Sequence, residues 1–317
     1  MARGRGQYPH TLYPAHSQGT RVHIALARSR EPDRAGTADD PLAEALARRG
    51  GEVSRPCWDD PEVEWGDADL VLVRTTWDYA QRRDEFLAWV ERVGESTEVL
   101  NPPQVLRWNT HKGYLLELEE RGAPVVPTAW LGRGDRVEIA EVLRARGWKR
   151  AVAKPAIGVG GRGLVRVEAD RPQEHDEALR ALLDAGDVLV QPYLEAVEER
   201  GELSVVVVNG EVSHAVRKRP RPGEYRVQQE RGATHERVEV DADTAALARW
   251  VVEATGHQLL LARVDLIEDE MGALQLVELE ATEPDLYLHL ASDGVERIAD
   301  ALLRRRAATQ GRDEEDQ

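Results

Sequence analysis

The chain has 317 residues, of which 41% are hydrophobic and 32% are charged, a composition typical of a globular protein with two or three small domains. Its 42 basic and 58 acidic residues give a formal net charge of −16, which argues against a nucleic-acid-binding protein because such proteins need a positive surface. The single cysteine, Cys57, excludes an intrachain disulfide bond and a cysteine-rich zinc site.

The N-terminal part of the chain indicates an extension followed by a small α/β domain. Residues 1–20 show no hydrophobic periodicity and no apolar segment of a secretory signal, so we expect a disordered extension. Strand patterns then alternate with helical patterns, which predicts an open α/β sheet over residues 21–107. The strands are expected at 22–27, 52–55 and 70–73, and the helices at 40–49 and 84–93. No apolar run reaches the length of a membrane span, so we expect a cytoplasmic protein without a membrane partner.

A polar segment follows the strand predicted at 70–73 and includes Arg74, Thr75, Trp77 and Asp78. In open α/β sheets, ligands bind beyond the carboxyl ends of the strands. The segment is therefore a candidate substrate-binding loop. The alternative is a local turn in which Trp77 serves only for packing.

The second section, residues 108–190, combines helices and strands around a glycine-rich loop. Helices are expected near 112–121, 137–146 and 173–184, and strands near 125–131, 150–154, 164–167 and 188–191. Lys154 directly precedes the loop, whose glycines are Gly158, Gly160, Gly161 and Gly163.

These glycines match the pattern G-x-G-x-x-G, but a strand pattern follows them where the dinucleotide-binding fingerprint requires a helix. A glycine-rich loop between two strands can lay its backbone N–H groups over phosphates. The sequence has no Gly-Lys-Ser or Gly-Lys-Thr of a P-loop and lacks the kinase motifs His-Arg-Asp and Asp-Phe-Gly. We therefore predict a phosphate-binding flap, and the alternative is a plain flexible turn.

The third section, residues 191–317, has the patterns of antiparallel strands. Asn209-Gly210 lies between two β-prone runs and predicts a type I′ hairpin turn. A second hairpin is expected from 259–267 and 274–279, with its turn near Met271-Gly272. The remaining elements are helices near 244–254 and 295–305 and a polar loop at 219–235. At the start of the section, Gln191, Tyr193 and Leu194 close a strand and could present backbone groups to a base, although alone they indicate only a strand end.

Three carboxylates are expected to converge on the second hairpin. Glu278 and Glu280 are two residues apart, so their side chains lie on one face of a strand, and the predicted turn places Asp265 opposite Glu278. Neighbouring carboxylates repel one another unless a cation lies between them. Oxygen ligands favour Mg²⁺. The alternative is a solvated acidic face in an acidic chain.

Basic residues are distributed unevenly. Only four of the 42 are lysines, namely Lys112, Lys149, Lys154 and Lys218, and arginine cannot replace lysine where a compact point charge is needed. Lys218 and Arg226 belong to a cation-rich segment at 214–231, which is a candidate site for phosphates or carboxylates. The alternative is a basic loop without a ligand.

In this order, the features resemble the ATP-grasp superfamily of ligases, and within it the glutathione-synthetase-like group. The segments RTTWDY, HAVRKRPRPGEYRVQ and ELEATEPDLYL are similar to the cyclo-ligases that close the ring in cycloserine biosynthesis, the O-ureido-serine cyclo-ligases. The resemblance implies an ATP-grasp fold over residues 21–305, with a Rossmann-like α/β domain first and an α+β arrangement in the C-terminal part. The two ATP-grasp subdomains would be residues 108–190, with the flap, and 191–317, with the metal site.

The resemblance also implies roles for individual residues. Glutathione synthetases usually carry Asn at the position of Glu280, so this chain departs from them there. For ATP, the resemblance implies phosphate binding by Lys112 and Lys154, a flap of Gly158, Gly160, Gly161 and Gly163, an adenine pocket of Gln191, Tyr193 and Leu194, and ribose binding by Glu202. For the metal, it implies Mg²⁺ ligation by Asp265, Glu278 and Glu280. For catalysis, it implies contacts of Lys218 and Arg226 with the transferred phosphoryl group.

The function implied is an ADP-forming ligase that uses ATP and Mg²⁺ to activate a small amino acid-like carboxylate as an acylphosphate. A nucleophile, an amine or a thiol, then displaces phosphate. One alternative is ring closure within a single substrate, and another is an ATP-binding regulatory module without chemistry. Dimers are frequent in the superfamily, so a homodimer is one expected state.

Overall fold

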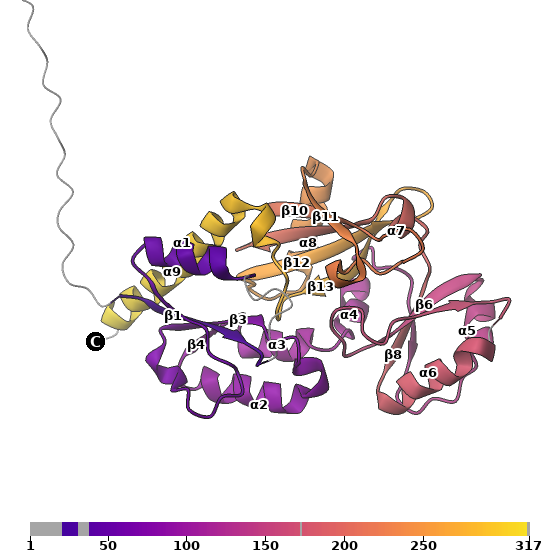
Figure 1. Cartoon of the computed structure of the whole chain (residues 1–317), viewed down its shortest axis with the longest axis horizontal. Helices are drawn as coiled ribbons and strands as arrows, with labels where there is room; N and C mark the ends of the chain where they lie inside the picture. The colour runs from indigo at the N-terminus through magenta and orange to yellow at the C-terminus, as the bar shows by residue number, and fades with distance from the viewer. Residues whose placement is uncertain (1–20, 31–37, 172, 316–317) are drawn as a thin grey trace, which may run out of the picture.

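The computed structural model describes residues 21–30, 38–171 and 173–315, so the extension predicted at 1–20 lies outside the described residues. Three sheets organise the chain (Figure 1). The α/β fold class predicted from the sequence is confirmed, with a parallel sheet first and antiparallel sheets after it. Within the described ranges, no helix combines the length and the apolar composition needed to cross a membrane.

The first sheet is parallel and has the strand order β2-β1-β3-β4. Its strands are β1 (His23–Arg28), β2 (Glu52–Ser54), β3 (Leu70–Thr75) and β4 (Glu98–Leu100). Alternate residues of β1 and β3 face opposite sides, because side chains alternate along a strand. Leu26 and Leu72 pack with helices α1 (Asp40–Arg48) and α9 (Ser292–Glu315), whereas Ala27 and Val73 pack with α2 (Arg83–Gly94). Both faces are therefore covered, as parallel sheets require.

Two elements of this region were not predicted. They are β4 and the short helix α3 (Pro103–Asn109), which starts directly after Pro102 and runs through the expected domain limit at residue 107. The expected limits at residues 107 and 190 stay predictions.

The second sheet is antiparallel, with the order β5-β8-β6-β7. Its strands are β5 (Ala129–Leu131), β6 (Arg150–Pro155), β7 (Val165–Glu168) and β8 (Val188–Pro192), and its helices are α5 (Ile139–Arg146) and α6 (Gln173–Ala185). The strand predicted at 125–131 is shorter than expected, because Val125 makes only an isolated bridge to Leu276 of the third sheet. Gly147 ends α5 with a φ of 69°, a conformation that favours glycine.

The third sheet has the order β11-β10-β9-β12-β13. Its strands are β9 (Glu202–Val208), β10 (Glu211–Arg219), β11 (Thr234–Val238), β12 (Leu261–Glu268) and β13 (Leu274–Glu280). Strand β11 was not predicted and shortens the expected loop at 219–235. The other elements are the helices α4 (Tyr114–Glu120), α7 (Ala196–Glu199) and α8 (Ala242–Ala254) and the 3₁₀ turns at Trp65–Asp67, Tyr79–Gln81, Gln229–Arg231 and Leu288–Leu290.

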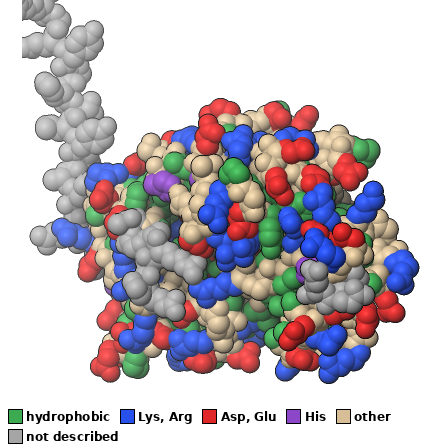
Figure 2. Space-filling model, turned by 45° about the vertical axis from the view of Figure 1, so that its right-hand side comes forward, with side chains coloured by type: hydrophobic (Ala, Val, Ile, Leu, Met, Phe, Trp, Pro, Cys, Tyr) green, Lys and Arg blue, Asp and Glu red, His purple; other side chains and the backbone are tan. Residues whose placement is uncertain are grey.

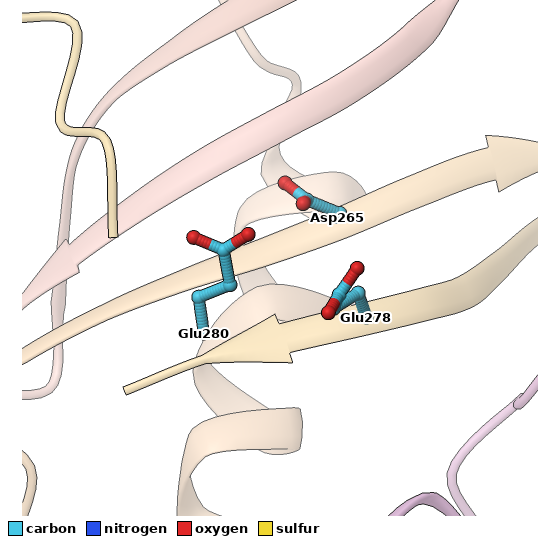
Figure 3. A group of neighbouring side chains, drawn as sticks. All are labelled: Asp265, Glu278 and Glu280. Carbon is cyan, nitrogen blue, oxygen red and sulfur yellow. The ribbon is translucent and has the colours of Figure 1, made fainter. Parts of the chain in front are cut away.

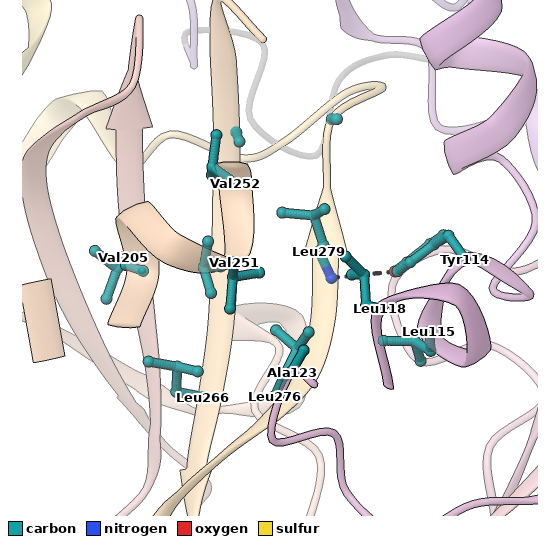
Figure 4. Packing of buried hydrophobic residues seen from close by; sticks show 14 of the residues in the cluster. Tyr114, Leu115, Leu118, Ala123, Val205, Val251, Val252, Leu266, Leu276 and Leu279 are labelled. Carbon is teal, nitrogen blue, oxygen red and sulfur yellow. Dashed lines mark hydrogen bonds between the residues drawn. The ribbon is translucent and has the colours of Figure 1, made fainter. Parts of the chain in front are cut away.

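Helices α4 and α8 cover one face of the third sheet, whereas Val206 and Leu261 on its other face pack with α9. Leu118 of α4 and Val251 of α8 pack with Leu276 and Leu279 of β13 (Figure 4). Tyr114 of α4 also accepts a hydrogen bond on its hydroxyl from the Leu279 backbone N–H at 3.1 Å. A buried apolar layer between these two helices and the sheet therefore fixes the position of β13.

The hairpin turn predicted at Asn209-Gly210 is confirmed, because both residues have positive φ, 50° and 82°, and Glu211 pairs with Val208. We expect Gly210→Ala to lower the free energy of unfolding by about 1 kcal/mol, since a Cβ is disfavoured in the left-handed region. Urea denaturation measures this. The control is Gly186→Ala, where nothing lies within 4 Å of the added Cβ and no positive φ exists. Equal stability of the two variants would contradict the prediction.

Candidate active site

A cavity of about 570 Å³ opens between the three sheets. Residues of all three line it, among them Asp78 after β3, Lys154 of β6 and Glu278 of β13, and the glycine-rich loop supplies part of its wall. One face of the molecule carries side chains of both signs of charge (Figure 2), despite the net charge of −16. Charged side chains from segments that are distant in the sequence therefore meet at this cavity.

The three carboxylates predicted to converge do so. Asp265 pairs with Glu278 across β12 and β13, as the hairpin register predicted, and Glu280 lies two residues further on the same face of β13 (Figure 3). Each residue offers a carboxylate oxygen within 4.8 Å of the others. Asp265 is 2% exposed and accepts a hydrogen bond from the Ser204 hydroxyl at 2.6 Å. The set is a candidate magnesium site, since it consists only of hard oxygen donors.

Arg263, which the sequence analysis missed, contacts two of these carboxylates. Its guanidinium donates to both Asp265 oxygens at 2.9 and 2.8 Å and also to Glu280. Burial opposes ionisation of Asp265, but Arg263 and Lys218 outweigh it and lower the pKa of Asp265 to about 2. Burial raises the pKa of Glu280 to about 8. The spacing Arg-x-Asp on one strand could have indicated this ion pair.

The structure places three of the four lysines at the cavity. Lys112 Nζ lies 2.9 Å from Glu278 Oε1 and donates to the Gly158 carbonyl at 2.8 Å. Lys218 pairs with Glu202 and lies 3.7 Å from Asp265 Oδ2. Burial alone would lower the pKa of Lys218, but Asp265 and Glu202 outweigh it and raise it. Lys112 was expected on a helix and instead precedes α4 by two residues.

Lys154 differs from the other two because, among the described residues, its ammonium group has only a 3.4 Å contact with the Val277 carbonyl. Burial lowers the pKa of Lys154 to about 8, although Glu278 opposes the shift. If its ammonium binds phosphate, ATP affinity should fall about tenfold per pH unit above pH 8, because only the protonated form attracts the anion.

Calorimetric titration of ATP across this pH range measures the effect. Lys154→Arg is the control, because arginine keeps its charge at these pH values and should bind ATP with a flat profile. A wild-type affinity that does not change with pH would contradict the prediction.

The flap glycines differ in position. Gly158, Gly160 and Gly161 line the cavity, whereas Gly163 is not part of its wall. Gly161 has a φ of 65°, and a Cβ there would lie 3.0 Å from the Gln228 side chain, so the flap packs closely against the segment that follows β10. Arg226 of that segment lines the cavity, and its Nε lies 2.9 Å from Glu224 Oε1.

The residues expected to contact adenine lie outside the cavity wall. Gln191 donates to the Thr128 hydroxyl at 3.0 Å, and Tyr193 and Leu194 pack with Val227 and Tyr225. Glu202 does line the cavity, and burial raises its pKa. The structure thus places the predicted ribose and phosphate residues on the cavity wall, and Tyr193 and Leu194 one layer behind the wall residues Tyr225 and Val227.

The RTTWDY segment divides into two roles. Trp77 and Asp78 line the cavity, whereas Thr75 is 4% exposed and Arg74 is 2% exposed, and neither belongs to the cavity wall. Arg74 Nε donates to Asp39 Oδ1 at 2.8 Å, and its Nη1 donates to the Pro284 carbonyl at 2.9 Å. Arg74 therefore positions the segment after β13 without itself lining the cavity.

We expect Arg74→Met to lower the free energy of unfolding by about 3 kcal/mol or more, because it leaves the Asp39 carboxylate buried without its partner. Thermal and urea denaturation measure this. The matched control is Arg48→Met, which removes an ion pair whose arginine side chain is 57% exposed, and it should change stability by less than about 1 kcal/mol. Similar losses in both variants would argue against the prediction.

Two further residues at the cavity, Asn109 and Glu283, were not predicted from the sequence. Asn109 donates to the Leu279 carbonyl at 2.8 Å and accepts from the Ala281 N–H at 2.7 Å, so it positions β13. Glu283 is 5% exposed and lines the cavity. Its place in the ELEATEP segment, close after the metal-binding pattern, was the only available indication.

Comparisons with known proteins match two parts of the chain to described domains. Residues 24–101 match the N-terminal domain of D-cycloserine synthetase DcsG, and residues 124–285 match the ATP-grasp domain of prokaryotic glutathione synthetase. The cycloserine biosynthesis protein DcsG of Streptomyces lavendulae is 33% identical over 279 residues, which is 84% of this chain and 92% of that protein.

Solved structures give the same result. The crystal structure of D-cycloserine synthetase DcsG has a TM-score of 0.81 at 29% identity and covers 90% of this chain and 99% of that one. The ATP-grasp ligase PsnB complexed with minimal precursor, Mg and ADP has a TM-score of 0.59 at 21% identity, with 90% and 98% covered. The second likeness concerns the fold alone.

Proposed function

The chain belongs to the ATP-grasp ligases of the glutathione synthetase type, and on that premise we propose that it activates a small amino acid-like carboxylate with ATP and joins it to a nitrogen nucleophile. The resemblance inferred from the sequence is thereby confirmed at the level of the family. The observation that carries the proposal is the meeting of Lys112, Lys218 and the three carboxylates in one cavity. A cytoplasmic location and a homodimer stay predictions.

Magnesium fits the donor set of this cavity. ATP-grasp ligases use ATP with Mg²⁺, and Asp265, Glu278 and Glu280 would hold the ion here, because they are the described carboxylates that converge on one point. Arg263 contacts Asp265 and Lys112 contacts Glu278, which supports the view that this acidic group is balanced by cationic charge. When bound, Mg²⁺ would neutralise the phosphate charge that develops during transfer.

The protein's own residues would position the nucleotide. Lys154 and Lys112 lie on the cavity wall beside the flap, where their ammonium groups would bind phosphate oxygens. Backbone N–H groups of the flap would add hydrogen bonds, and Glu202 would accept one from the ribose. Phosphoryl transfer depends mainly on such positioning and charge neutralisation.

The reaction would then proceed in two steps. A substrate carboxylate oxygen attacks the γ-phosphorus, the bond to the β–γ bridging oxygen breaks, and ADP leaves with an acylphosphate as the product. A nitrogen nucleophile next attacks the acyl carbon, inorganic phosphate leaves, and the nitrogen loses a proton. Lys218 and Arg226 would stabilise the transferred phosphoryl group, and closure of the flap would exclude water from the acylphosphate.

Ring closure within one substrate is the second candidate function. It is favoured by the likeness to the protein named D-cycloserine synthetase, which extends over the N-terminal part as well as the ATP-grasp part. In that reaction, the acid would carry its own nitrogen nucleophile, and the product would be the substrate minus one water. A ligation would combine the masses of two substrates minus one water.

Coupled ADP release with a panel of amino acids and nucleophiles tests both functions, and the product mass distinguishes them. We expect turnover with wild type and its loss in Lys154→Ala. Equal ADP release by wild type and this variant would rule out the proposed site. Tight ATP binding without turnover on any acid would support the regulatory alternative.

A further inference from the structure

Glu283 is a buried carboxylate that the proposed mechanism does not use. It follows β13 in the segment Ala281-Thr282-Glu283, is 5% exposed and lines the cavity. Among the described residues, its side chain has no hydrogen-bond donor and no ion-pair partner. Burial raises the pKa of Glu283 well above its usual range, and Glu280 adds to the rise. A carboxylate that is buried without a partner is costly, so its presence at a cavity wall calls for a ligand.

The nearby cations cannot serve as its partner. Lys112 and Arg263 both act on Glu283 electrostatically, but Lys112 is paired with Glu278 at 2.9 Å and Arg263 with Asp265 at 2.8 Å. Glu283 is also outside the group of Asp265, Glu278 and Glu280 whose oxygens converge within 4.8 Å. The missing positive charge would therefore come from a molecule that enters the cavity.

The backbone around Glu283 is held from the N-terminal sheet. The Trp77 indole N–H contacts the Glu283 carbonyl at 3.4 Å, and Arg74 donates to the carbonyl of the next residue, Pro284, at 2.9 Å. Arg74 is itself fixed by Asp39 at 2.8 Å. Glu283 is thus presented rigidly at the part of the wall that Trp77 and Asp78 also line. Rigid presentation of a carboxyl group, which an incoming cation would hold in its ionised form, is what a specific binding site needs.

A nucleotide does not meet this requirement, because its phosphates are anionic and would repel a carboxylate. An amino acid does, because it carries an ammonium group beside the carboxylate that is to be activated. We propose that Glu283 binds the free ammonium group of the acid substrate and thereby selects 2-amino acids over acids that lack this charge. This inference rests on the proposed function for the identity of the cavity as the acid site.

The proposal predicts a loss of selectivity rather than a general loss of activity. Glu283→Gln keeps the size of the side chain and removes its charge. For a panel of D- and L-2-amino acids that includes O-ureido-serine, the variant should raise KM by about 10- to 100-fold, the range expected for a charged hydrogen bond. For the matched 2-hydroxy acids, KM should stay within about threefold of wild type. Glu283→Asp should recover part of the selectivity.

Controls separate a binding role from other roles of Glu283. The melting temperature of Glu283→Gln must match that of wild type. Glu253→Gln, which alters an exposed carboxylate on α8, should leave KM unchanged for both classes of acid. ATP affinity and the Mg²⁺ dependence of turnover should be unchanged in Glu283→Gln. Equal KM changes for amino and hydroxy acids, an unchanged KM for both, or a shifted Mg²⁺ dependence would each overturn the proposal.

The test also distinguishes failure of the inference from failure of the ligase function. If no member of the panel is turned over by wild type, the proposed function fails for these acids. Calorimetry with the ATP-loaded protein then compares binding of each 2-amino acid with that of its 2-hydroxy partner. Binding that prefers the amino acid in wild type and loses this preference in Glu283→Gln supports the inference, and the absence of any preference in wild type overturns it.

Discussion

Glu278→Gln is expected to lower kcat for ADP formation by about 10³-fold, the upper range for removal of one electrostatic group at a reacting centre. Glu278 belongs to the predicted metal site and also contacts a lysine, because it faces Asp265 across the hairpin and pairs with Lys112 at 2.9 Å. Lys112 and Lys154 outweigh the effect of burial and lower the pKa of Glu278, so its charge is present at neutral pH. Glutamine keeps the shape and removes that charge.

ADP release over a range of Mg²⁺ concentrations measures the loss. The matched control is Glu270→Gln, an exposed residue in the turn of the same hairpin, and it should leave kcat unchanged. Recovery of wild-type kcat at high Mg²⁺ would indicate that Glu278 contributes only to metal affinity. Full activity of Glu278→Gln at all Mg²⁺ concentrations would refute the assignment.

Lys154→Arg is expected to reduce kcat/KM for ATP by about 10²-fold, because a displacement of about 1 Å at a reacting centre has an effect of this size. Lys154 is 7% exposed on β6, and arginine would replace its compact point charge with a wider guanidinium that cannot shed its charge in a buried site. Lys112→Arg should reduce ATP use as well, since the ammonium is held between Glu278 and the Gly158 carbonyl.

Lys149→Arg provides the comparison for both variants. Lys149 is exposed just before β6 in the turn that follows α5, so the same chemical change should have no effect there. Steady-state kinetics with ATP as the varied substrate measures all three variants. The prediction is wrong if Lys154→Arg and Lys149→Arg behave alike.

The hairpin carboxylates illustrate what could be read from the chain directly. Asp265, Glu278 and Glu280 converge because side chains alternate along strands and because the turn near Gly272 fixes the register, and both properties are local. The same holds for the turn at Asn209-Gly210, since positive φ at two consecutive residues favours these amino acids. Short-range geometry was enough in each case.

Strand β11 and the shortened strand β5 show where local patterns failed. β11 carries Thr234, His235 and Glu236, which have no apolar alternation, and it exists because β10 offers an edge with which it can pair. Residues 125–128 have strand-like character, but Val125 instead bridges to Leu276 of another sheet. Pairing partners that are distant in the sequence decided both outcomes.

The sequence by itself determined the family and the fold class and indicated candidate residues for phosphate and metal chemistry, because these depend on residue type, spacing and local backbone preference. Only the tertiary structure decided which charges face one another. It paired Arg74 with Asp39 and with the Pro284 carbonyl, and so made Arg74 a support for the cavity wall. It also left Glu283 buried at the cavity, with no cation paired to it in the described part of the chain. Burial and long-range pairing determine the free energy of keeping each side chain charged in the folded protein, and neither can be predicted from one segment of the chain.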